Sequence, residues 1–123
     1  MPSKASHEHH QMNYIEITVN DMSRSTKFYS NAFGWEFNDY GSEYTGIQGT
    51  EREMGGFTLN KKHKGQTNPA CLVILYSKNL DKSVEAVKEA GGKILKAPFA
   101  FPGGRRFHFA DPNGNELAVW AEA

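Results

Sequence analysis

An arginine and a histidine alternate with two phenylalanines in the stretch RRFHFADPNGNELAVW, residues 105–120. Neighbouring side chains of a strand point to opposite faces, so Phe107 and Phe109 share one face and Arg106 and His108 share the other. A guanidinium binds carboxylates and similar anions, and histidine exchanges a proton near neutral pH. The stretch therefore predicts either a solvated sheet face or the wall of a small-molecule site.

The sequence divides into two similar halves, and this stretch lies at the end of the second. Each half is predicted to run strand, helix, strand, strand, strand. In the second half the DPNG turn joins the last two strands. The helix of the first half, NDMSRSTKFYSNAFGW, aligns with KNLDKSVEAVKEAGGK in the second. Such a tandem repeat predicts an α+β fold in which one helix covers one face of each sheet. The other face is left to curl around a cavity. The modules are expected at about 12–60 and 70–122, within a single domain at 12–123.

Length and composition limit the function classes. A chain of 123 residues with a formal net charge of +0 suits one domain and argues against nucleic acid as the main partner. It contains neither a membrane-length apolar run nor a secretory signal, so no membrane contact and a cytoplasmic location are expected. The single cysteine, Cys71, lies in the apolar run ACLVILY and is expected to be buried.

Residues 1–11 are polar and aperiodic, which predicts a flexible N-terminal arm. His7, His9 and His10 lie in this arm. They are interpreted either as a mobile tail or as a metal-binding tract, and the first interpretation is favoured because a disordered arm must lose entropy to enclose an ion.

The pattern V-N-D-M, then F-Y-x(3)-F-G-W, then A-G-G and F-x-D-P-N-G-N-x-L resembles the vicinal oxygen chelate superfamily over about residues 12–122. That superfamily includes glyoxalase I, extradiol dioxygenases and the fosfomycin and bleomycin resistance proteins. The resemblance implies two βαβββ modules, a U-shaped sheet around each site, and a homodimer. It does not fix the activity.

The resemblance also implies four strand positions that hold a divalent metal in enzymes of this superfamily. In this sequence they correspond to Tyr14, Gly56, Leu72 and Ala118. A metal site needs imidazole, carboxylate or thiolate ligands, which this set lacks. The sequence therefore predicts no metal and no cofactor, and classical glyoxalase I or dioxygenase activity is not expected.

The same alignment places the remaining polar and aromatic residues on the cavity face. Glu16, Arg106 and His108 are predicted as the catalytic group, with Glu16 paired to Arg106 or to His108. That pair is interpreted equally as part of a site or as a buried salt bridge. The predicted substrate-binding residues are Tyr14, Thr58, Asn60, Tyr76 and Trp120.

The resulting prediction is a protein that binds a small, anionic organic molecule in a metal-free cavity. If it is an enzyme, lyase- or isomerase-type proton transfer next to a carbonyl is expected. The alternative is non-catalytic sequestration of a small molecule or drug.

Overall fold

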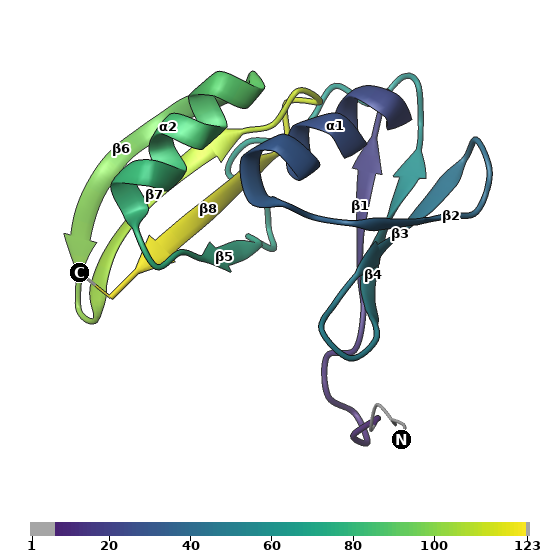
Figure 1. Ribbon diagram of the computed structural model, residues 1–123, viewed down its shortest axis with the longest axis horizontal. Coiled ribbons are helices and arrows are strands. Elements are labelled where there is room, and N and C mark those ends of the chain that lie inside the picture. The colour runs from purple at the N-terminus through teal and green to yellow at the C-terminus, as the bar shows by residue number, and fades with distance from the viewer. Residues whose placement is uncertain (1–6, 123) are drawn as a thin grey trace.

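The computed structural model describes residues 7–122, which form two four-stranded sheets and two helices (Figure 1). In chain order the elements are β1 (Ile15–Val19), α1 (Met22–Phe33), β2 (Phe37–Asp39), β3 (Tyr44–Gln48), β4 (Glu53–Leu59), β5 (Ile74–Tyr76), α2 (Leu80–Ala90), β6 (Lys93–Phe101), β7 (Gly104–Ala110) and β8 (Glu116–Ala121). This is the predicted α+β repeat of two βαβββ modules.

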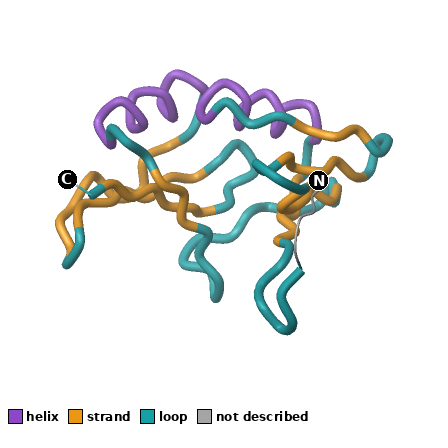
Figure 2. The backbone as a smooth tube through the Cα atoms, turned by 60° about the horizontal axis from the view of Figure 1, so that its bottom comes forward, coloured by secondary structure: helices purple, strands orange, loops and turns teal. Residues whose placement is uncertain are grey.

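The strand order is β1-β4-β3-β2 in the first sheet, here sheet A, and β5-β8-β7-β6 in the second, here sheet B. In each sheet the first strand of the module pairs in parallel with the last one, and the other neighbours are antiparallel. Both helices lie on the same side of the sheets (Figure 2). The opposite face of each sheet is therefore free of helices. Neither helix is long and apolar enough to cross a membrane.

Each helix begins and ends at residues suited to those positions. The Asp21 side chain accepts a hydrogen bond from the Arg24 N–H, and Asn79 does the same for Lys82. Gly34 ends α1 at φ 73°, in the left-handed region that glycine adopts without strain.

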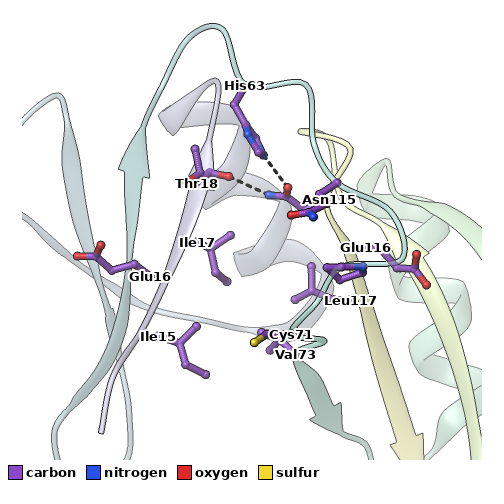
Figure 3. Close-up of a pocket in the computed structure, with 12 residues that line it drawn as sticks. Ile15, Glu16, Ile17, Thr18, His63, Cys71, Val73, Asn115, Glu116 and Leu117 are labelled. Carbon is purple, nitrogen blue, oxygen red and sulfur yellow. Dashed lines mark hydrogen bonds between the residues drawn. The ribbon is translucent and has the colours of Figure 1, made fainter. Parts of the chain in front are cut away.

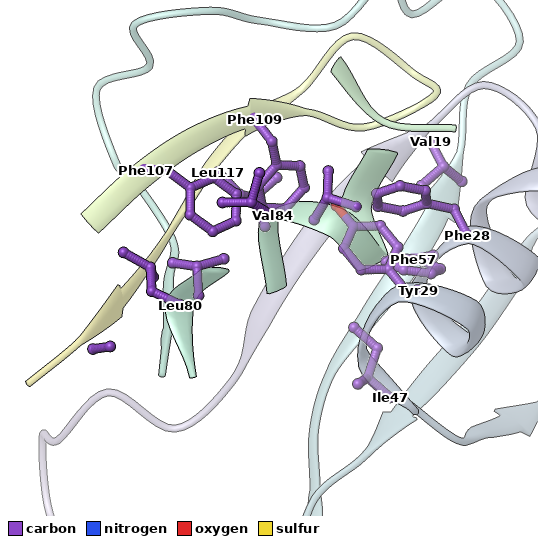
Figure 4. Packing of buried hydrophobic residues seen from close by; sticks show 13 residues of the cluster. Val19, Phe28, Tyr29, Ile47, Phe57, Leu80, Val84, Phe107, Phe109 and Leu117 are labelled. Atoms are coloured by element: carbon purple, nitrogen blue, oxygen red, sulfur yellow. The ribbon is translucent and has the colours of Figure 1, made fainter. Parts of the chain in front are cut away.

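The hydrophobic core lies between the helices and the sheet faces that they cover (Figure 4). Phe107 and Phe109 are fully buried in it, as the alternation of β7 predicted. Phe28 and Tyr29 of α1 pack against this cluster, and the Phe28 ring lies 6.0 Å from that of Phe109. Because an α1 residue meets a β7 residue, the two modules share one core.

The turn between β7 and β8 fastens the modules together. The buried Asp111 carboxylate accepts a hydrogen bond from the Tyr29 hydroxyl of α1 at 2.8 Å. Asn113 accepts one from the Asn20 backbone N–H at 2.8 Å, and Asn115 donates one to the Thr18 carbonyl at 2.8 Å. The DPNGN sequence thus reaches both β1 and α1 of the other module.

One local prediction in the second half was wrong. Cys71 is exposed, because β5 begins only at Ile74 and residues 70–73 cross between the modules instead of extending the strand. β6 continues unbroken through Pro98, with register shifts on either side of Lys96. An edge strand tolerates proline because one side of its backbone needs no partner strand.

Only part of the predicted arm, residues 7–11, lies within the described residues, and residues 1–6 lie outside them. Residues 7–11 are exposed and lie beyond the start of β1, far from the helices (Figure 1). His7 Nδ1 accepts one hydrogen bond from the Asn13 side-chain amide, at 2.9 Å.

Replacing Tyr29 by Phe should destabilise the fold by about 1.5–3 kcal/mol, because it removes a hydrogen bond to a buried charge. Chemical denaturation measures the change. Tyr40→Phe is the matched control: its hydroxyl also donates to a carboxylate at 2.8 Å, but the residue is 60% exposed. Equal losses in the free energy of unfolding for the two substitutions would show that burial of the hydrogen bond from Tyr29 to Asp111 adds no stability beyond that of an exposed one.

Candidate functional site

The helix-free face of sheet B carries two neighbouring cross-strand rows of side chains. Arg106 of β7 pairs with Phe99 of β6 and with Trp120 of β8, which pairs in turn with Tyr76 of β5. The second row, from β6 to β5, consists of Lys96, His108, Ala118 and Ile74. Residues directly opposite in a sheet share a face, so Arg106 and His108 lie on one wall, as predicted.

His108 is held in one orientation by a buried acid. Its Nδ1 lies 2.7 Å from a Glu116 carboxylate oxygen, and the two side chains are only 4% and 8% exposed. The other carboxylate oxygen accepts the Asn68 backbone N–H at 2.6 Å. Both contacts hold the pKa of Glu116 below its usual range. The Asn68 N–H has the largest effect, and the His108 contact has the next largest. The second ring nitrogen of His108, Nε2, is buried without a hydrogen-bond partner.

Arg106 is partly buried among aromatic rings. Its guanidinium carbon lies 5.4 Å from the Phe99 ring centroid and 5.9 Å from that of Phe101. Its Nε is buried without a hydrogen-bond partner, and Arg106 takes part in none of the ion pairs of residues 7–122. A buried donor without an acceptor costs free energy, so this nitrogen lowers the stability of the fold as long as it has no partner.

A second polar cluster occupies the helix-free face of sheet A. The Tyr14 hydroxyl donates to Glu53 at 2.9 Å and lies 2.8 Å from the Tyr44 hydroxyl, which donates to Glu16 at 3.1 Å. Asn38, and next Tyr40, lower the pKa of Glu53 through hydrogen bonds. The pKa of Tyr14 is raised, mostly by burial and to a smaller extent by the contact with Tyr44. At neutral pH the cluster therefore combines anionic carboxylates with neutral hydroxyl donors.

Within one chain these two clusters do not meet. Figure 3 shows the carboxylates of Glu16 and Glu116 pointing away from each other, while Ile17 and Leu117 lie between them. Glu16 bonds to Tyr44, so its predicted pairing with Arg106 or His108 was wrong. The cause is the packing of the modules: their helix-covered faces share the core, which turns the free faces outward.

The other predicted binding residues are also divided between the two sheets. Tyr76 and Trp120 join the sheet B face, where their rings lie 5.1 Å apart. Thr58 and Asn60 lie at the end of β4 in a separate depression that also includes Thr18 and Lys61. Neither belongs to the Arg106 cluster.

A cavity of about 230 Å³ separates the modules, between β1, residues 63–73 and the start of β8 (Figure 3). Ile17, Val73 and Leu117 form apolar parts of its wall, and Cys71 also lines it. His63 lines this cavity as well, and its Nε2 lies 2.7 Å from the Asn115 side-chain oxygen. This contact secures the linker to the DPNGN turn.

The four positions that hold a metal in related enzymes do not fit a metal here. The Tyr14 hydroxyl is engaged by Glu53 and Tyr44, and a side chain at Gly56 would collide with the Tyr44 hydroxyl. Leu72 and Ala118 have no donor atom. Across residues 7–122, no three His, Cys, Asp or Glu side chains gather in a way that could hold a metal ion.

Comparison with known proteins agrees with this architecture. The family model described as Glyoxalase/Bleomycin resistance protein/Dioxygenase superfamily matches residues 11–119, so the chain belongs to that superfamily. No curated protein sequence matches it.

Several solved structures share the fold. A glyoxalase-related enzyme from Fulvimarina pelagi is 21% identical with a TM-score of 0.75, over 91% of this chain and 88% of that one. A hypothetical protein from S. aureus is 25% identical with a TM-score of 0.72, over 90% and 93%. A glyoxalase I mutant from Zea mays is 28% identical with a TM-score of 0.68, over 89% of this chain but 45% of that one.

Sequence reasoning missed Glu116 as the partner of His108. The hairpin register contains the signal: His108 pairs with Ala118, which makes Glu116 its diagonal neighbour across the strands. Glu53 was also missed, and no comparable signal existed, because a register shift near Gln48 determines where it lies.

Glu116→Gln should lower stability at neutral pH, and the loss should shrink in acid. The folded-state pKa of Glu116 lies below its unfolded value, so the unfolded chain binds more protons in that interval and stability rises with pH. The contribution is present above about pH 4.3 and is lost as pH falls through the folded-state pKa. Urea unfolding between pH 3 and 7, on the order of five points, measures it.

Glu89→Gln, on the exposed surface of α2, is the control and should follow the wild-type pH profile. A constant difference between Glu116→Gln and wild type at all pH values would contradict the expectation.

Proposed function

We propose that this chain binds a small organic anion on the helix-free face of sheet B and transfers a proton next to a carbonyl without a metal. The observation that carries the proposal is the pair of unpartnered buried nitrogens, Arg106 Nε and His108 Nε2, on neighbouring rows of one face. Arg106 supplies the positive charge for the anion. His108 supplies the base.

The Glu116 contact prepares His108 for this role. With the Nδ1 proton donated to Glu116, the neutral ring carries a lone pair on Nε2. Nε2 then takes a proton from the carbon next to the carbonyl. The C–H electron pair forms the carbon–carbon double bond of an enolate, and the carbonyl π pair moves to its oxygen. Return of a proton from the imidazolium restores both partners.

Pyruvate is a minimal probe of this step. In D₂O, the wild-type protein should accelerate loss of the pyruvate methyl proton signal, followed by NMR. His108→Gln should reduce the rate about 10²–10⁴-fold, the usual contribution of a positioned base. His63→Gln is the control, because His63 belongs to the cavity between the modules. Equal rates for wild type and His108→Gln would contradict the role of His108 as the base.

Sequestration without turnover is the second candidate. It is favoured by the aromatic surroundings of Arg106, which hold an anion but supply no further proton donor or acceptor. Binding of pyruvate without proton exchange in the wild-type protein would favour this candidate over the enzymatic one.

A homodimer would complete the site. The free face of sheet A carries Glu16 and Glu53, neither of which has an ion-pair partner within residues 7–122. The free face of sheet B carries Lys96 beside the site, which can oppose these carboxylates and leave Arg106 for the ligand. These faces point away from each other in one chain, so a second copy is needed to oppose them. Ile74, exposed by 43% on the edge strand of sheet B and in the same row as His108, supplies apolar surface for the contact.

Ile74→Glu should weaken this dimer, because it places a charge at the apolar contact. Sedimentation equilibrium should show a dimer for the wild-type chain and dissociation for the variant. Met12→Glu is the matched control, since Met12 is 96% exposed but lies outside the strands. A monomeric wild-type chain would refute the pairing.

A further inference from the structure

Aromatic rings surround Arg106 on three strands. Phe99 of β6 and Trp120 of β8 are its direct neighbours across the sheet, and Phe101 approaches the guanidinium from the end of β6. Trp120 makes edge-on contacts with Phe101 at 6.2 Å and with Tyr76 at 5.1 Å. The only charged group of this row is therefore enclosed by flat, apolar walls.

The space beside these rings is a cavity of about 270 Å³ lined by Ile74, Phe101, Arg106 and Trp120. Ala118 lies in the neighbouring row, between His108 and Ile74. The cavity thus combines apolar walls with one cation.

The Arg106 guanidinium can bind a carboxylate through two parallel hydrogen bonds, because its planar fork matches the two carboxylate oxygens. Its Nε lacks a partner and is buried, so it gains most from such an acceptor. One guanidinium compensates one negative charge. A phosphate would bring a second charge into walls that have no other cation facing them.

We propose that this cavity selects a flat aromatic carboxylate, with the carboxylate on Arg106 and the ring against Trp120 and Phe101. The inference rests on the anion site proposed above and adds the class of ligand. Aromatic rings attract one another edge-to-face or in offset stacks beyond the burial of their area, and a saturated ring does not.

The position of His108 adds a preference within this class. Two residues along a strand span about 6.7 Å, so His108 lies roughly one substituted ring away from Arg106. A hydroxyl opposite the carboxylate would point along this face toward the unpartnered Nε2, which is buried beside the cavity and makes the contact once the His108 ring turns toward the ligand. An aromatic carboxylate with such a hydroxyl therefore satisfies both unpartnered nitrogens at once.

Isothermal titration calorimetry with matched probes tests the class of ligand. Benzoate should bind about tenfold tighter than cyclohexanecarboxylate, which has the same charge and a similar size but no aromatic face. Benzyl alcohol, which has the ring without the charge, should bind more weakly than either. 4-Hydroxybenzoate should bind more tightly than benzoate.

Variants assign each effect to its residue. Trp120→Leu keeps apolar bulk and should abolish the preference for benzoate over cyclohexanecarboxylate, while Arg106→Gln should abolish binding of both acids. His108→Leu should remove the advantage of 4-hydroxybenzoate over benzoate. Circular dichroism checks that each variant is folded.

The outcomes separate the two proposals. Equal affinity of the wild-type protein for benzoate and cyclohexanecarboxylate would overturn the aromatic class and leave the anion site standing. Absence of binding by both acids would overturn the anion site and this inference together. Benzyl alcohol binding as tightly as benzoate would show that Arg106 does not recognise the carboxylate.

Discussion

The buried carboxylate of Asp111 is the constraint on which the arrangement of the two modules depends. It lies in the turn between β7 and β8, and it accepts hydrogen bonds from the Tyr29 hydroxyl and from the backbone of Asn113 and Asn115. A buried charge is tolerated only with such a set of donors. One set of hydrogen bonds therefore shapes the turn and joins it to α1.

That junction determines which surfaces remain available for function. Because Tyr29 is tied to Asp111 and Phe28 packs near Phe109, the helix-covered faces of both sheets are used in a common core. The helix-free faces then point outward on either side of the cavity between the modules. The sheet B face has buried nitrogens that lack partners, whereas the hydroxyls and carboxylates of sheet A largely satisfy one another.

Alternation along single strands made much of this predictable. Phe107 and Phe109 are buried and Arg106 and His108 share the other face, as the sequence of β7 indicated. The partners of charged groups were harder to predict, because they depend on how strands and modules meet. Glu16 bonds to Tyr44 across sheet A, where the bulge near Gln48 also directs Glu53. Cys71 belongs to an apolar run, yet the crossing between the modules exposes it.

The replacement of metal ligands and the chemistry of sheet B have a common physical basis. Gly56 and Ala118 stand where related enzymes carry metal ligands, and the space at Gly56 is filled by the Tyr44 hydroxyl. Ala118 is fully buried between His108 and Ile74 of the neighbouring strands. Arg106 carries its charge at any physiological pH and needs no ligand cage. Its two phenylalanine neighbours limit its contact with water, which strengthens its attraction for an anion. The helix-free face of sheet B therefore carries a guanidinium between aromatic rings, beside an imidazole that Glu116 orients.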